Sequence, residues 1–110
     1  MSDYPSVEVL KQIETHNILS GRESFLELLD LLKQEWKWEN YISIKGENAI
    51  RLELHTGGWS GNEDIISALE KNTSFWMACW MKSERGGHYY FSMNLTTFYK
   101  NAHSASACVP

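Results

Sequence analysis

The sequence predicts an α+β domain: a four-stranded mixed sheet built from two hairpins, with its helices packed on one face. Residues 20–36 repeat hydrophobic positions at helical spacing, residues 41–55 hold two alternating runs joined by a short turn, and residues 75–95 hold another pair of strand-like runs. The expected order is α-α-β-β-α-β-β. A length of 110 residues with 43% hydrophobic residues fits one folded unit. We assign residues 1–95 to this domain and residues 96–110, which lose the pattern, to a flexible C-terminal tail.

Two helices are expected before the first strand. Residues 6–19 carry a partial helical stripe. Ser20 and Glu23 have the spacing of a capping box, in which each side chain satisfies a free amide of the first helical turn. The hydrophobic positions that follow at helical spacing are Phe25, Leu28, Leu29, Leu32 and Trp36. Because the opposite face is acidic, packing on a sheet is favoured over a membrane surface or a partner's groove.

The first hairpin is expected at residues 41–45 and 50–55, with the turn at residues 46–48. Alternation along the second strand divides its side chains between a buried and an open face. The buried set is Ile50, Leu52 and Leu54, and the open set is Arg51, Glu53 and His55.

Residues 54–62, Leu-His-Thr-Gly-Gly-Trp-Ser-Gly-Asn, connect the second strand to a third helix. Ser60 and Glu63 form a second capping-box pattern, which places the start of this helix near Gly61, and Asn72 is its expected end. A strand, a glycine-rich turn and a helix together bind phosphate in other proteins. The stretch lacks the lysine of a phosphate-binding loop and has acid in the first helical turn, so both a ligand cradle and a turn that needs positive φ stay open.

The second hairpin is expected to consist of a central strand at residues 75–81, a turn at residues 82–87 and a last strand at residues 88–95. A right-handed crossover is expected if the second and third strands are parallel. Trp76 and Tyr90 are either exposed, as a homodimer surface, or covered by the first helix.

The two turns that follow the second and third strands open at one end of the sheet if those strands run in parallel. Binding sites favour such strand ends. A tryptophan would stack on a flat ligand, an arginine would pair with its anion, and backbone amides would complete the cradle. The candidate ligand-binding residues are Thr56, Gly57, Gly58, Trp59, Ser60, Asn62, Arg85 and His88.

Composition and spacing exclude several classes of function. A formal net charge of −4 disfavours nucleic acid as a partner. With neither a signal peptide nor a long apolar run, the expected location is the cytoplasm, without a membrane partner. Cys79, Cys108 and the four histidines lack metal-ligand spacing, so neither a metal nor a cofactor is expected. The sequence also lacks a nucleophile motif, which favours a protein that is not an enzyme and has no catalytic residues.

Two motifs resemble a group of small uncharacterised phage and prophage proteins: Thr-Gly-Gly-Trp-Ser-Gly-Asn-Glu, from Thr56, and Arg-Gly-Gly-His-Tyr, from Arg85. The resemblance covers residues 53–93, implies a phage context in a host cytoplasm, and carries over no catalytic residue. The expected function is a non-enzymatic binding protein that sequesters an anionic, nucleotide-like ligand or docks on and inhibits a host protein, including in counter-defence. The alternative is a small nucleotide-directed hydrolase or transferase that uses His55 or His88 as its acid–base.

Overall fold

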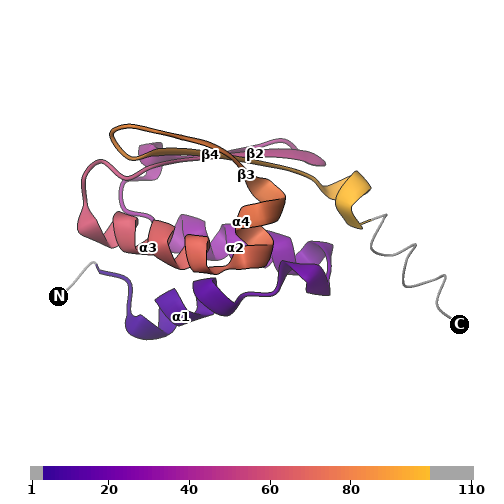
Figure 1. Cartoon of the computed structure of the whole chain (residues 1–110), viewed down its shortest axis with the longest axis horizontal. Helices are drawn as coiled ribbons and strands as arrows, with labels where there is room; N and C mark the ends of the chain where they lie inside the picture. Colours follow the sequence, from indigo (N-terminus) through magenta and orange to yellow (C-terminus); the bar gives the residue numbers. More distant parts are fainter. Residues whose placement is uncertain (1–3, 100–110) are drawn as a thin grey trace, which may run out of the picture.

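The computed structural model describes residues 4–99. The helical elements alternate with two pairs of strands along the chain (Figure 1). The helical elements are α1 (Val7–Thr15), the 3-10 turn η1 (Ile18–Ser20), α2 (Arg22–Glu35), the 3-10 turn η2 (Glu39–Tyr41), α3 (Ser60–Lys71) and α4 (Thr73–Cys79). The strands are β1 (Ile42–Lys45), β2 (Ala49–His55), β3 (Trp80–Glu84) and β4 (His88–Asn94).

The four strands form one sheet in the order β1-β2-β4-β3. The α+β class and the two hairpins are confirmed, but the prediction of a mixed sheet is wrong, because all three pairings are antiparallel. The chain leaves β2, passes through α3 and α4 to the outer edge at β3, and returns as β4 between β3 and β2. β2 and β3 therefore run in the same direction with β4 between them, so the chain does cross over from β2 to β3 through α3 and α4, but these two strands do not pair with each other.

The predicted central strand at residues 75–81 is wrong as well: residues 73–79 are helix α4, and β3 begins at Trp80 as an edge strand. Asn72 starts the helix, since its side-chain oxygen accepts a hydrogen bond from the Phe75 amide at 3.2 Å. Phe75 and Cys79, four residues apart, are both buried, whereas Met77 is 81% exposed. An uninterrupted apolar run fits either a buried strand or a short helix, and here the cap selects the helix.

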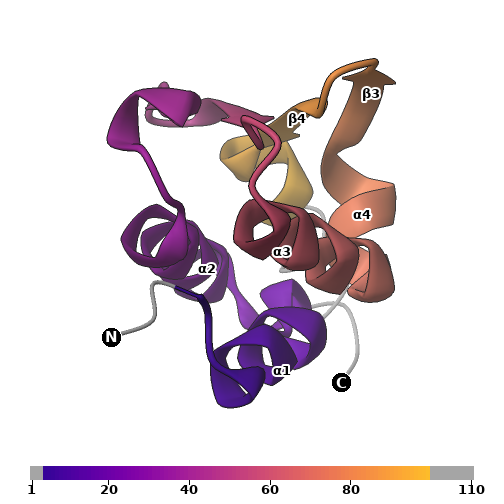
Figure 2. The same cartoon turned by 90° about the vertical axis from the view of Figure 1, so that its left-hand side faces the viewer.

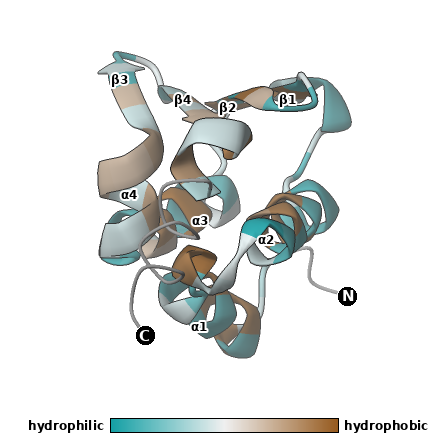
Figure 3. Ribbon diagram, turned by 90° about the vertical axis from the view of Figure 1, so that its right-hand side faces the viewer, coloured by the Kyte–Doolittle hydropathy of each residue, from teal (hydrophilic) through white to brown (hydrophobic). Residues whose placement is uncertain are grey.

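The helices lie on one face of the sheet in two layers (Figure 1). Seen from the end of the molecule, α2, α3 and α4 lie beneath the strands, and α1 lies below α2 and α3 (Figure 2). Hydrophobic residues gather on one side of α2 and hydrophilic ones on the other (Figure 3). The largest fully buried side chains come from every layer: Phe25, Phe75, Phe91, Ile13, Ile18, Leu28, Leu32, Leu52, Leu54, Ile65, Leu69 and Leu95.

Neither predicted capping box forms. The N-cap of α2 is Gly21 and that of α3 is Trp59, and neither start has a side-chain capping hydrogen bond. The Ser60 hydroxyl instead accepts a hydrogen bond from the Tyr4 hydroxyl at 2.6 Å. Both helices therefore owe their stability to the apolar face that they bury rather than to the cap.

The folded part extends past the predicted boundary at residue 95. Residues 95–99 are helical, Leu95 is fully buried, and Phe98 and Tyr99 pack against the core. The remainder of the predicted tail, residues 100–110, lies outside the described residues. Within residues 4–99, no helix combines the length and hydropathy that crossing a bilayer requires.

Candidate functional site

The two turns singled out in the sequence lie side by side at one end of the sheet. The backbone N–H of Thr56, just after β2, donates to the carbonyl of Gly87 at 2.9 Å, and His55 is the register partner of His88. This end is on the left in Figure 1 and faces the viewer in Figure 2, where the link from β2 to α3 runs between the β3–β4 turn and the segment before β1. The convergence arises because β4 is antiparallel to both neighbours.

The glycine pair after β2 is a turn that needs left-handed backbone. Gly57 has φ 62° and Gly58 φ 78°. A Cβ at Gly57 would lie 2.7 Å from the Tyr41 ring and 2.8 Å from the Trp38 ring, so this glycine also lets two rings approach the backbone. The Gly58 amide donates to the Thr56 hydroxyl and the Trp59 amide to the Thr56 carbonyl. These two amides are therefore engaged within the turn rather than directed at a ligand.

Four rings surround the glycine turn, and we call Tyr4, Trp38, Tyr41 and Trp59 the aromatic cluster. Trp59 lies 5.1 Å from Tyr4 and 6.5 Å from Trp38, centroid to centroid, and Trp38 lies 5.5 Å from Tyr41. Tyr4, Trp38 and Tyr41 are exposed and Trp59 is half-buried. The Lys37 ammonium lies 4.8 Å from the Trp59 ring and 5.5 Å from the Trp38 ring, within the range of cation–π attraction. Exposed rings around a cation make a surface suited to stacking.

The backbone of Trp38 is strained, with φ 68° and ψ 99°, which is rare for a residue with a side chain. Such a conformation costs on the order of 1–3 kcal/mol and persists where the surroundings impose it. The rings of Tyr41 and Trp59 contact Trp38, and Gly57 leaves room for it. In this conformation the Trp38 side chain lies at the surface.

Thr56 and Asn62 are buried, with 1% and 0% of their surface exposed, so they support the surrounding backbone rather than bind a ligand. We call them the supporting residues. The Asn62 side chain accepts from the Lys37 amide at 3.0 Å and donates to the carbonyls of Lys37 and Thr56, each at 3.3 Å. It thereby ties the segment before β1 to the glycine turn. These two predicted site residues hold the aromatic cluster in place from inside.

On the other side of the glycine turn, His55 and His88 face each other on the open face of the sheet. Their Nδ1 atoms are 2.7 Å apart, so one ring donates a hydrogen bond and the other accepts it. The His55 Nε2 atom lies 3.7 Å from a Glu53 carboxylate oxygen. Glu53, His55 and His88 thus form a chain of contacts, and the structure brings Glu53 to the histidines.

Glu84 is the register partner of His88 at the edge of the sheet. The Lys82 ammonium, 3.2 Å away, and a hydrogen bond from the Tyr90 hydroxyl lower the pKa of Glu84 below its ordinary value. This exposed carboxylate is therefore charged at neutral pH. Its negative charge would repel an anion placed over the strands near His88.

The predicted site residues divide into three groups. Trp59 and Ser60 lie with the aromatic cluster, whereas Arg85 and His88 lie on the opposite side of the glycine turn. The supporting residues, Thr56 and Asn62, lie between these two groups. Sequence reasoning missed the contributions of Tyr4, Trp38 and Tyr41 to the aromatic cluster, of Lys37 beside it, and of His55 to the histidine pair. The close spacing of Trp36, Lys37, Trp38 and Tyr41 is a visible signal, whereas the histidine pair needs the strand order.

The open face of the sheet has a shallow cavity of about 280 Å³, lined mainly by side chains of β2, β3 and β4, including Glu53, Lys82 and Tyr90. Trp76 does not join Tyr90 there, because its ring stacks on Trp80 at 6.2 Å and meets Phe91 at 5.4 Å on the helical side. Trp76 is therefore covered by Trp80 and Phe91 rather than lying beside Tyr90, and a homodimer surface at these residues stays a prediction. Among residues 4–99, three His, Cys, Asp or Glu side chains do not gather around a position that a metal ion could occupy.

Comparison of the chain with known protein families found no match. Comparisons with curated proteins and with solved structures found no significant similarity.

Proposed function

We propose that this is a non-enzymatic binding protein that captures a flat, anionic, nucleotide-like ligand where the two turns meet. The observation that carries the proposal is the pairing of an exposed aromatic cluster with cationic side chains across one glycine turn, in a chain whose formal net charge is −4. Stacking on an indole and pairing of an anion with arginine are the interactions that such ligands use.

Side chains, rather than backbone amides, would hold the ligand. A base would stack on Trp38 or Trp59, and its anionic group would reach Lys37 on the aromatic side or Arg85 across the turn. His88 would donate from its outer nitrogen. The engaged amides of Gly58 and Trp59 leave the backbone a smaller role than the sequence suggested.

The phage context implied by the two sequence motifs gives this capture a use: it would remove a nucleotide signal from the host cytoplasm. Docking of the same surface on a host protein is the other form of the proposal. Half-exposed Trp and Tyr side chains are the residues that most often dominate the energy of such contacts.

The first prediction concerns ligand capture. Calorimetry and mass spectrometry with mono-, di- and cyclic nucleotides should find one that binds and is recovered unchanged. Arg85→Ala should weaken its binding about tenfold or more, because a charge-assisted contact is lost. Arg51→Ala removes an exposed arginine from the opposite end of β2 and serves as the matched control.

Equal affinities of the Arg85→Ala and Arg51→Ala variants would rule out Arg85 as the partner of the anion, and unchanged binding in Lys37→Ala as well would rule out the meeting point of the two turns as the binding site. Silence of the whole panel at millimolar concentration would eliminate nucleotide capture and leave protein docking, which a pull-down from host lysate with Trp38→Ala as the comparison would examine.

A small hydrolase or transferase is the second candidate function, because Glu53, His55 and His88 form a chain of contacts. A carboxylate that orients one imidazole, which in turn orients another, is an arrangement used in acid–base catalysis. Turnover of a panel member that His88→Ala abolishes would favour this candidate over capture.

A further inference from the structure

The side chain of Lys37 lies over the indoles on which a base would stack. Its ammonium is 4.8 Å from the centroid of the Trp59 ring and 5.5 Å from that of the Trp38 ring. A Cβ at Gly61 would overlap the benzene ring of Trp59, so the start of α3 packs against this indole. The rings of Tyr4 and Trp38 lie beside it. A flat ligand that stacks on Trp59 would therefore displace the ammonium.

The backbone of Lys37 is fixed, whereas its side chain can move. The Asn62 side chain is fully buried, accepts a hydrogen bond from the Lys37 amide at 3.0 Å and donates one to the Lys37 carbonyl at 3.3 Å. A lysine carries its ammonium on a flexible chain of methylene groups. The ammonium can therefore leave the rings without a change in the surrounding backbone.

Ligands with and without a phosphate differ in what they offer the displaced ammonium. The attraction of an ammonium to an exposed ring is worth a factor of about twofold to fivefold in an equilibrium. An uncharged nucleoside that stacks on the indoles removes this attraction and puts nothing in its place. A nucleotide presents a phosphate that the ammonium can bind, and this charge-assisted contact is stronger than the one that is lost. The difference between the two affinities is selectivity.

We propose that Lys37 makes the aromatic cluster selective for phosphorylated ligands. The ammonium occupies the indoles in the unliganded protein and moves to the phosphate once a base has stacked in its place. This selection rests on the proposed capture of a nucleotide-like ligand, and it narrows the ligand class to molecules that carry a flat ring and a phosphate together.

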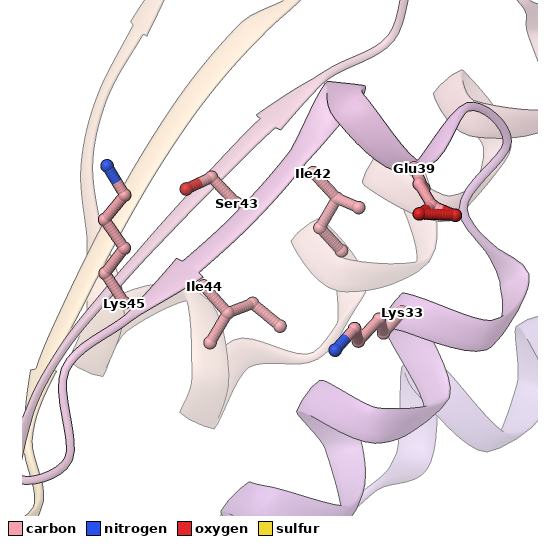
Figure 4. A pocket seen from close by; sticks show the side chains of 6 residues that line it. All are labelled: Lys33, Glu39, Ile42, Ser43, Ile44 and Lys45. Carbon is pink, nitrogen blue, oxygen red and sulfur yellow. The ribbon is translucent and has the colours of Figure 1, made fainter.

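A cavity between β1 and α2 offers an anion another place to bind and supplies the control. Its volume is about 430 Å³, within the roughly 300–1,000 Å³ typical of ligand pockets. The Lys33 side chain extends from α2 toward β1 in this cavity (Figure 4). The residues that line the cavity, all in the described part of the chain, include no aromatic ring. This cavity can therefore pair with an anion but offers no ring on which a base stacks.

The test is calorimetry of the full chain with ribonucleosides and the matching monophosphates. The natural protein should bind a monophosphate about tenfold or more tightly than its nucleoside. Lys37→Ala should bind the monophosphate about tenfold more weakly, because the charge is lost, and the nucleoside about threefold more tightly, because the rings are uncovered. Lys33→Ala removes the same charge from the cavity and should change neither affinity.

The outcomes separate selection by Lys37 from ligand capture itself. If neither class of ligand binds the natural protein, nucleotide capture fails and selection by Lys37 fails with it. If the monophosphate binds but Lys37→Ala changes both affinities by the same factor, capture stands and selection by Lys37 is rejected. A loss in Lys33→Ala as large as that in Lys37→Ala would place the anion in the cavity and also reject it.

A second readout follows the ammonium directly in the natural protein. The nuclear Overhauser effect between the ε-methylene protons of Lys37 and the ring protons of Trp59 should be present without ligand, since the ammonium lies over that ring. It should disappear when the monophosphate is bound. Its persistence in the complex would show that the ammonium stays on the indole, and would overturn the proposal.

Discussion

At the scale of single residues, two glycines with the same backbone conformation have different neighbours. Gly58 has φ 78° and Gly87 φ 82°, so both occupy left-handed backbone. A Cβ at Gly58 would meet nothing within 4 Å, whereas one at Gly87 would overlap the Thr56 hydroxyl. Gly87 is therefore required both for its conformation and for the close approach of the two turns.

This difference gives a prediction with its own control. Gly58→Ala should lower the free energy of unfolding by about 1 kcal/mol, the cost of left-handed backbone for alanine. Gly87→Ala should cost about 1–3 kcal/mol more, because the two turns must also move apart. Urea denaturation of both variants measures the difference, and equal losses would contradict the packing of Gly87 on Thr56.

The candidate site shows which residues the sequence can place and which it cannot. The sequence located the two turns because glycine pairs mark left-handed backbone. It could not show that Thr56 and Asn62 are buried supporting residues, because a polar residue in a motif looks the same whether it faces a ligand or the interior. It also could not pair His55 with His88, which are 33 residues apart and meet only through the strand order.

At the scale of elements, Asn72 joins three helices. It ends α3 and begins α4, and its amide nitrogen donates to the carbonyls of Ile13 and His16 at the end of α1, each at 2.8 Å. The side chain is 4% exposed, so its hydrogen bonds replace water that could not reach these carbonyls. The same side chain caps the first turn of α4 and so favours a helix for the apolar run that follows.

Asn72→Ala should therefore lower the free energy of unfolding by about 3 kcal/mol, the sum of a lost cap and two unsatisfied buried carbonyls. Asn94→Ala is the matched control, because Asn94 is exposed and accepts one hydrogen bond from the Thr97 amide at 2.9 Å. Its loss should cost about 1 kcal/mol or less. Thermal unfolding followed by circular dichroism would measure the loss of stability in both variants. Equal losses would contradict the role of Asn72 in connecting the three helices.

The elements that the sequence predicted correctly are those with periodic patterns. Alternation set Ile50, Leu52 and Leu54 on the buried face, and the helical repeat of α2 buried Phe25, Leu28, Leu29 and Leu32. The error at residues 75–81 has a physical cause: an apolar run without alternation carries no period, and the Asn72 side chain that caps α4 is itself held by hydrogen bonds to α1, more than fifty residues away. The antiparallel order is likewise a property of the assembled sheet.

At the scale of the whole molecule, Tyr99 connects the end of the described chain to its beginning. The hydroxyl donates to the Ile18 carbonyl at 2.8 Å, across 81 residues. Burial, with a smaller contribution from Cys79, raises the pKa of Tyr99 to about 12. The ring packs against the core, so the segment after β4 belongs to the folded unit.

Tyr99→Phe should lower the free energy of unfolding by about 1 kcal/mol at neutral pH, because the Ile18 carbonyl loses its donor. An unfolded tyrosine ionises near pH 10. Since the folded pKa lies higher, the natural hydroxyl contributes fully below about pH 10 and loses its contribution as the pH rises toward 12. Urea denaturation at increasing alkaline pH should therefore show a shrinking difference in the free energy of unfolding between the natural protein and Tyr99→Phe. A difference that does not change with pH would show that folding does not raise the pKa of Tyr99.

The insertion of β4 between the two hairpins has a consequence for how the polypeptide is made. Ribosomal synthesis proceeds at roughly 5–20 residues per second, so β2 emerges a few seconds before its neighbour β4. During that interval the edge of β2 that later pairs with β4 is free, and Ile50, Leu52 and Leu54 are exposed to solvent. Nascent chains of this protein should therefore be bound by chaperones until Asn94 has emerged, and be released once β4 pairs with β2.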